Sequence, residues 1–186
     1  MNIKNTKTEL PKVSATIVAK YLLSLDLERK YFSKNQVLII DDKDNYRSKP
    51  TIGNFRLNKM LQIIQALYYA CYSQPLFEDD MVAFENGGVV FKIYRGFMKL
   101  HEEKSEFFSS YYLTTKQQEF ISKVFSYLKD HYSDNELRDL AHEDVAWQKA
   151  WKSGKKFIYN NEVLEYYKAL SSSMLRAMGL LEEMDR

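Results

Sequence analysis

The sequence has few residues that interrupt helices, with 3 prolines and 6 glycines among 186 residues. Both types disfavour helix interiors, so their scarcity favours long helices. Long hydrophobic runs are also missing, and none approaches the roughly 20 residues of a membrane-spanning helix. Residues 1–9 are polar and lack the apolar core of a signal peptide. We therefore expect a cytoplasmic protein.

Cysteine is nearly absent, and strong net charge is absent too. The single cysteine, Cys71, excludes an intramolecular disulfide and suits a reducing compartment. Because it falls within a helical apolar pattern, we expect a buried structural thiol. The 27 basic and 25 acidic residues leave a net charge of +2. Such a balance gives no electrostatic argument for nucleic-acid binding.

Catalytic motifs are missing as well. The sequence contains neither a Gly-x-Ser-x-Gly elbow nor a His-Glu-x-x-His zinc motif. The pair Gly87-Gly88 lacks the longer loop and the lysine of a phosphate-binding site. We therefore predict no catalytic residues, no metal and no cofactor. The alternative is a metal-dependent hydrolase, whose ligands would come from a short stretch of the chain: His131, His142, Glu143 and Asp144.

Helical periodicity dominates what is present. We predict a mainly α fold, with a single compact domain of about seven helices over residues 12–186. Residues 1–11 should form a flexible tail, and residues 27–51 an insertion or loop. A branched aliphatic run predicts at most one minor β element, near residues 36–41.

The strongest helical pattern follows Gly53-Asn54. Its apolar positions are Leu57, Met60, Leu61, Ile64, Leu67, Tyr68 and Cys71. Further apolar residues lie off this stripe, which is typical of a helix at the centre of a core. Arg56 and Lys59 near its start are interpreted as solvent-facing residues.

Further helix starts are marked by capping residues. Ser14, Thr114 or Thr115, the capping box Ser133–Glu136, and Asn160 or Asn161 each precede an amphipathic segment. The last helix has a heptad-like stripe that should pack on the domain: Val163, Tyr167, Leu170, Met174, Ala177 and Leu181.

Both tryptophans lie close together, at Trp147 and Trp151. If this segment is helical, the two indoles stack on one face. We expect Trp147 to be buried against the helix of residues 57–67, so that its replacement by alanine costs about 3–5 kcal/mol. His142 should lie at or just before the start of the same helix, bound to backbone or to a carboxylate.

The order of several short motifs resembles a known family. The motifs are Asn54 to Gln62, Gln74 to Phe77, Ala83 to Val90 followed by Ile93-Tyr94, Leu140 to Trp147, and Ile158-Tyr159. Across residues 14–170 this order is similar to the Panacea domain of SocA-like antitoxins, also catalogued as a phage-associated domain. Two departures stand out: Gly88 replaces the proline of the family's Gly-Pro-Val, and Ala141 replaces a threonine before His142.

The resemblance implies an antitoxin that neutralises a cognate protein toxin, by direct binding or as an adaptor that delivers the toxin to a protease. Neither mechanism needs catalysis. The alternative within the same resemblance is an adaptor of a phage or mobile element without a toxin partner. A second copy of the chain is a further candidate partner.

The residues expected to contact a partner come from these motifs and from the aromatic excess of 14 Tyr and 11 Phe. They are Arg56, Lys59, Gly88, Val89, Tyr94, Phe108, Tyr112, His142, Trp147 and Trp151. We expect one exposed aromatic patch, which comprises Tyr94, Phe97, Met98, Phe107, Phe108, Tyr111 and Tyr112. The alternative is that this run covers the core.

Overall fold

The computed structural model describes residues 11–38, 50–103, 112–154, 156–157 and 159–180. Within them lie seven α-helices and one two-stranded sheet, which confirms the mainly α prediction. In chain order the elements are α1 (Ala15–Ser24), α2 (Ile52–Tyr72), β1 (Val82–Phe84), β2 (Gly87–Val89), α3 (Phe91–Glu102), α4 (Thr115–His131), α5 (Asp134–Glu143), α6 (Val145–Ser153) and α7 (Asn161–Ala177).

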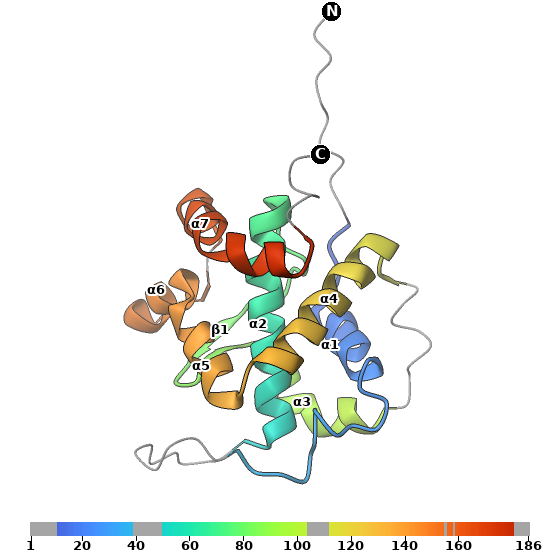
Figure 1. The fold of residues 1–186 in the computed structure, drawn as a ribbon. Coiled ribbons are helices and arrows are strands. Elements are labelled where there is room, and N and C mark those ends of the chain that lie inside the picture. Colours follow the sequence, from blue (N-terminus) through green and yellow to red (C-terminus); the bar gives the residue numbers. More distant parts are fainter. Residues whose placement is uncertain (1–10, 39–49, 104–111, 155, 158, 181–186) are drawn as a thin grey trace, which may run out of the picture.

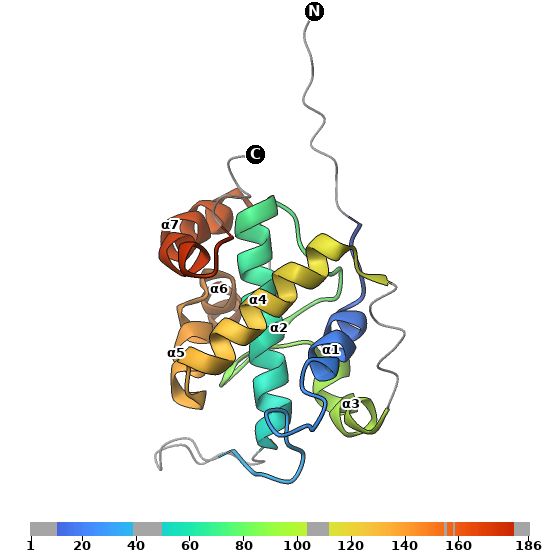
Figure 2. The same ribbon diagram turned by 45° about the vertical axis from the view of Figure 1, so that its right-hand side comes forward.

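Helix α2 is the centre of the molecule, as its apolar pattern predicts. Figures 1 and 2 show it upright, with α1 and α3 to one side and α5, α6 and α7 to the other. In Figure 2, α4 crosses in front of it. All residues from Leu57 to Ala70 are buried, including four polar ones. The whole circumference of α2 is therefore enclosed by the other elements.

The predicted capping residues begin the helices where expected. Ser14 caps α1, Asn160 caps α7, and Thr114 and Ser133 form capping boxes at the starts of α4 and α5. Helix α2 begins slightly earlier than predicted, with Thr51 as its cap. Each cap satisfies backbone N–H groups that a helix start leaves unpaired.

The sheet lies away from the predicted β element. Near residues 36–41 the described part of the chain has only an isolated bridge between Val37 and Thr51. The two strands instead form an antiparallel hairpin, β1–β2, in which Phe84 pairs with Gly87. Residues 82–89 thus form a hairpin that we did not predict, and α3 begins at Phe91.

Two burial predictions need correction. Cys71 is half-buried rather than buried, because it lies near the carboxyl end of α2 where fewer elements cover the helix. On α7, Leu170 is exposed, and the buried residues are Val163, Leu164, Tyr167, Ser171 and Leu175. The face of α7 that packs on the domain is therefore rotated from the predicted stripe. The last stripe residue, Leu181, lies outside the described residues.

Close backbone packing fixes the start of α2. The Gly53 amide donates to the Ser33 carbonyl at 2.9 Å. A Cβ at position 53 would lie 2.6 Å from the Ser33 oxygen and still closer to the Phe32 carbonyl. Since backbone atoms cannot rotate away as a side chain can, the connection before α2 accepts only glycine here.

We predict opposite effects for two glycine substitutions. Gly53→Ala should lower the free energy of unfolding by about 2 kcal/mol or more, because the added methyl overlaps backbone atoms. Gly96→Ala, inside α3 where a Cβ meets no atom within 4 Å, should raise it by about 0.5–1 kcal/mol through helix propensity. Urea denaturation of both variants measures this. A Gly53→Ala protein as stable as the parent would contradict the packing described.

Candidate protein-interaction site

A row of polar side chains on one side of α2 faces the segment that follows the helix, from Leu76 to Val90. Asn58, Lys59, Gln62 and Gln65 are each at most 2% exposed. Gln65 binds the Leu76 and Phe77 amides and the Phe77 carbonyl at 2.9–3.2 Å. Asn58 accepts from the Val90 amide at 3.2 Å. Buried amides need such partners, so this row fixes the path of the chain from Leu76 to Val90.

The hairpin rests on the middle of this row. The Gly88 amide donates to Gln62 Oε1 at 2.7 Å, and Lys59 Nζ donates to the Gly88 carbonyl at 3.0 Å. Gly87 has a φ of +107°, and a Cβ there would overlap Lys59 Nζ. A Cβ on Gly88 would lie 2.6 Å from the Phe157 ring. The two glycines therefore allow a close approach between backbone and side chains.

The junction between α5 and α6 is bound to the same glutamine. Gln62 Nε2 donates to the Ala141 carbonyl at 2.9 Å and to Asp144 Oδ2 at 3.0 Å. Asp144 caps α6, because its Oδ1 accepts from the Ala146 and Trp147 amides at 2.8 and 3.1 Å. Gln62 thereby connects the hairpin to the start of α6.

His142 and Trp147 hold the hairpin turn from outside, and we call this pair the His142–Trp147 clamp. Their rings stack with centroids 4.4 Å apart and planes 12° from parallel. Trp147 Nε1 donates to the Phe84 carbonyl at 3.0 Å, and His142 Nε2 bonds the next carbonyl, that of Glu85, at 2.9 Å. The two rings thus bind successive carbonyls of one turn.

The clamp agrees with two expectations and corrects a third. His142 lies in the last turn of α5, just before α6, and binds backbone. Trp147 is buried, at 8% exposed. However, α6 packs chiefly on β1, α5 and α7 rather than on α2. Trp147 faces the hairpin, while its neighbour Ala146 packs against Ala66 and Ala70 of α2.

Trp151 extends the stack to the surface. Its ring lies parallel to that of Trp147, with centroids 5.8 Å apart, and 50% of the residue is exposed. Beside it is a hollow of about 230 Å³, whose described lining is Val82, Ala83, Ala150, Trp151, Gly154 and Lys156. A large aromatic group and a mostly apolar hollow therefore adjoin on one face, over α6 and β1.

Burial shifts the acid–base properties of the groups behind this face. Complete burial lowers the pKa of Lys59 to about 7, against a smaller opposing effect of Asp144. Burial raises the pKa of Asp144 and lowers that of His142. The solvent-facing interpretation of Lys59 is wrong, because the hairpin covers the side of α2 that carries it.

The remaining predicted residues lie elsewhere. Arg56 forms a bidentate ion pair with Asp134, with Nε to Oδ1 at 2.7 Å and Nη2 to Oδ2 at 3.1 Å. This pair connects α2 to the start of α5. Tyr94 is half-buried with its ring against Phe84 at 5.3 Å. Tyr112 is 63% exposed.

The expected aromatic patch is only partly described. Phe97 is buried in the core, so its place in an exposed patch is wrong, whereas Met98 is exposed. Phe107, Phe108 and Tyr111 lie outside the described residues. Val89 and Gly88 are buried in β2, so they belong to the support of the hairpin.

The proposed metal ligands do not converge. His131 Nδ1 bonds the Tyr127 carbonyl at 2.9 Å, and His142 binds the hairpin turn. Among the described residues, no three His, Cys, Asp or Glu side chains are grouped so that they could hold a metal ion.

Across the same part of the chain, no helix has the length and apolarity to cross a bilayer.

Comparison with protein families agrees with the motif order. Residues 57–148 match the family described as antitoxin SocA-like, Panacea domain. The chain contains a SocA-like Panacea domain. No curated protein and no solved structure matches the chain. The matched part of the Panacea domain includes the polar row of α2, the hairpin and the clamp, and ends between Trp147 and Trp151.

Gln62 is the important residue of this site that we did not predict, and Asp144 was predicted only as a metal ligand of the hydrolase alternative. A signal for Gln62 is present, because Asn58, Gln62 and Gln65 recur at helical spacing within an otherwise apolar helix. A polar stripe inside a buried helix indicates backbone partners. Asp144 stands where a helix cap is expected, directly before the tryptophan helix.

Lys59 predicts a pH dependence of stability. Its pKa of about 7 in the folded state lies below that of an unfolded lysine, near 10.4. Between these values the unfolded chain binds the extra proton, so stability rises with pH. From pH 7 to pH 9, we expect this group to raise the free energy of unfolding by about 2 kcal/mol.

Lys59→Met should remove this rise, as measured by urea denaturation at both pH values. Asp144 acts in the opposite sense, because its raised pKa makes it lose stabilising energy as pH rises. The difference between parent and variant therefore measures Lys59 together with its interaction with Asp144. An identical pH dependence in both proteins would contradict a buried amine at this position.

Proposed function

We propose that the protein is an antitoxin that neutralises a cognate protein toxin by binding it directly. The surface proposed for the toxin consists of Trp151 and the hollow beside it. The family match supports an antitoxin, and the half-exposed Trp151 is the observation that supports this surface.

Several features favour this surface over the other predicted contacts. Tryptophan is enriched among the residues that dominate binding energies, especially where it adjoins a pocket. The Trp151 ring stacks on a buried neighbour, so little side-chain freedom is lost when a partner binds. Arg56, Lys59 and Gly88 are committed to internal contacts. Tyr112 is the exposed alternative, and it provides a matched control.

The toxin for the test is a protein encoded beside this chain whose expression alone arrests growth. Trp151→Ala should weaken toxin binding at least about 30-fold, as expected for a central aromatic contact worth 2 kcal/mol. It should change the free energy of unfolding by less than about 1 kcal/mol, because the residue is half-exposed. Calorimetry measures the binding, and co-expression measures the rescue of growth.

Two controls accompany this variant. Tyr112→Ala should leave toxin affinity nearly unchanged, whereas Trp147→Ala should cost about 3–5 kcal/mol of stability. Full binding by Trp151→Ala together with lost binding by Tyr112→Ala would move the interface to the start of α4. If no stable complex forms and the rescue of growth fails in a strain without a host protease, the result would contradict direct neutralisation and support the adaptor mechanism.

A further inference from the structure

The Trp151 surface, that is Trp151 and the hollow beside it, is too small to bind a protein alone. A stable protein–protein interface buries about 800 Å² on each partner, whereas one large aromatic side chain contributes about 150–250 Å². A toxin that binds at Trp151 must therefore contact a neighbouring part of the surface as well.

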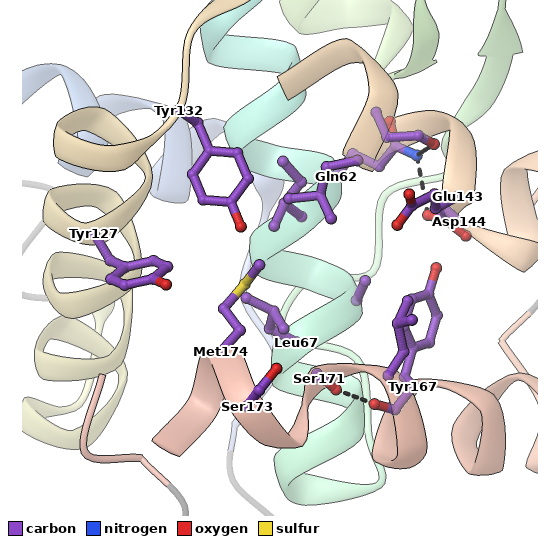
Figure 3. Close-up of a pocket in the computed structure, with 15 residues that line it drawn as sticks. Gln62, Leu67, Tyr127, Tyr132, Glu143, Asp144, Tyr167, Ser171, Ser173 and Met174 are labelled. Atoms are coloured by element: carbon purple, nitrogen blue, oxygen red, sulfur yellow. Dashed lines mark hydrogen bonds between the residues drawn. The ribbon is translucent and has the colours of Figure 1, made fainter. Parts of the chain in front are cut away.

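On the side of α7, polar groups bind one another. A cavity of about 280 Å³ lies between α2, α4, α5 and α7. In Figure 3 the Tyr167 hydroxyl points toward Asp144, with which it interacts. Asp144 also accepts from Gln62 at 3.0 Å. At the surface, Lys149 of α6 pairs with Glu162 of α7 at 2.6 Å. These contacts are all made within the chain.

On the other side, β1 leads from the hollow to the start of α3. All three residues of β1 are partly exposed; the first two line the hollow, and the third is Phe84. The Phe84 ring contacts those of Phe91 and Tyr94, with centroids 6.4 and 5.3 Å apart. An aromatic path thus continues from Trp151 to α3.

The outward face of α3 presents apolar and basic side chains together. Phe91 and Met98 are two turns apart, and each is 48% exposed. Arg95 lies between them in the sequence, and its guanidinium carbon is 5.6 Å from the centroid of the Phe91 ring. Lys99, one turn further on, is also exposed. An arginine that stacks on a ring can still donate to a carboxylate.

Three carboxylates on or beside α3 are bound by other cations. The pairs are Glu102 with Lys34, Glu103 with Lys20, and Asp79 with Lys92. Among the described residues, Arg95 and Lys99 form no ion pair. A carboxylate on a partner would complement these two cations, whereas a basic partner would be repelled.

We propose that the toxin interface continues from Trp151 across β1 to α3, where the toxin places a carboxylate between two apolar side chains. The carboxylate pairs with Arg95 and Lys99, and the apolar side chains contact Phe91 and Met98. This inference rests on the proposed function and adds to it the chemistry of the partner surface.

The test compares a charge reversal on α3 with a matched reversal elsewhere. Arg95→Glu should weaken toxin binding at least about tenfold at about 50 mM salt and less at about 500 mM, because salt screens exposed charges. Lys123→Glu makes the same change in net charge at an exposed position of α4, and it should weaken binding less than about threefold. Phe91→Ala should weaken binding about tenfold at both salt concentrations. Calorimetry measures each Kd.

Cross-linking gives a second measurement that needs no substitution. A carbodiimide, which joins lysine amines to adjacent carboxylates, should couple Lys99 to an Asp or Glu of the toxin. Changing that toxin residue to lysine should restore the affinity of Arg95→Glu. Cross-links confined to other lysines would contradict the pairing.

The remaining outcomes separate this inference from the proposed function. If the parent binds no toxin, both are wrong. If Trp151→Ala weakens binding but Arg95→Glu and Phe91→Ala bind as well as Lys123→Glu, only the extension to α3 is wrong. Binding to phosphatidylserine vesicles that Arg95→Glu abolishes, with toxin affinity unchanged, would assign this face of α3 to a membrane and overturn the inference.

Discussion

One side chain, that of Gln62, connects the parts of this molecule that are far apart in the sequence. It accepts from the Gly88 amide and donates to the Ala141 carbonyl and to Asp144. It is completely buried, so water cannot replace a lost partner. The hairpin, the end of α5 and the start of α6 must therefore keep their positions together. The Trp151 surface, which lies over α6 and β1, depends on these positions.

The contact between the His142 and Trp147 rings follows from the same arrangement. The two residues lie on different helices, and Asp144 between them caps the second helix. The chain direction changes at this cap, which brings the rings into parallel contact over the hairpin turn. The clamp has a structural role within the Panacea domain. His142, a metal ligand in the hydrolase alternative, instead donates from its ring to the Glu85 carbonyl.

The fold could be predicted from local signals, while the site could be predicted only in part. Capping residues and helical periodicity gave the helix starts and the central position of α2. The burial of Trp147 also followed from its residue type. The hairpin and the burial of Lys59 could not be predicted, because they depend on contacts between segments distant in the sequence. A lysine at a helix start carries no local sign of a hairpin that later covers it.

Hydrogen exchange at the Gly88 amide tests this account most directly. If Gln62 holds the hairpin, this amide should exchange only on near-global unfolding, as slowly as the amides in the middle of α2. In Gln62→Leu, which keeps a side chain of similar size but removes its polar atoms, it should exchange at least about a hundredfold faster relative to α2, since its acceptor is lost. Rapid Gly88 exchange in the parent protein, or equal protection in both proteins, would contradict the central role of Gln62.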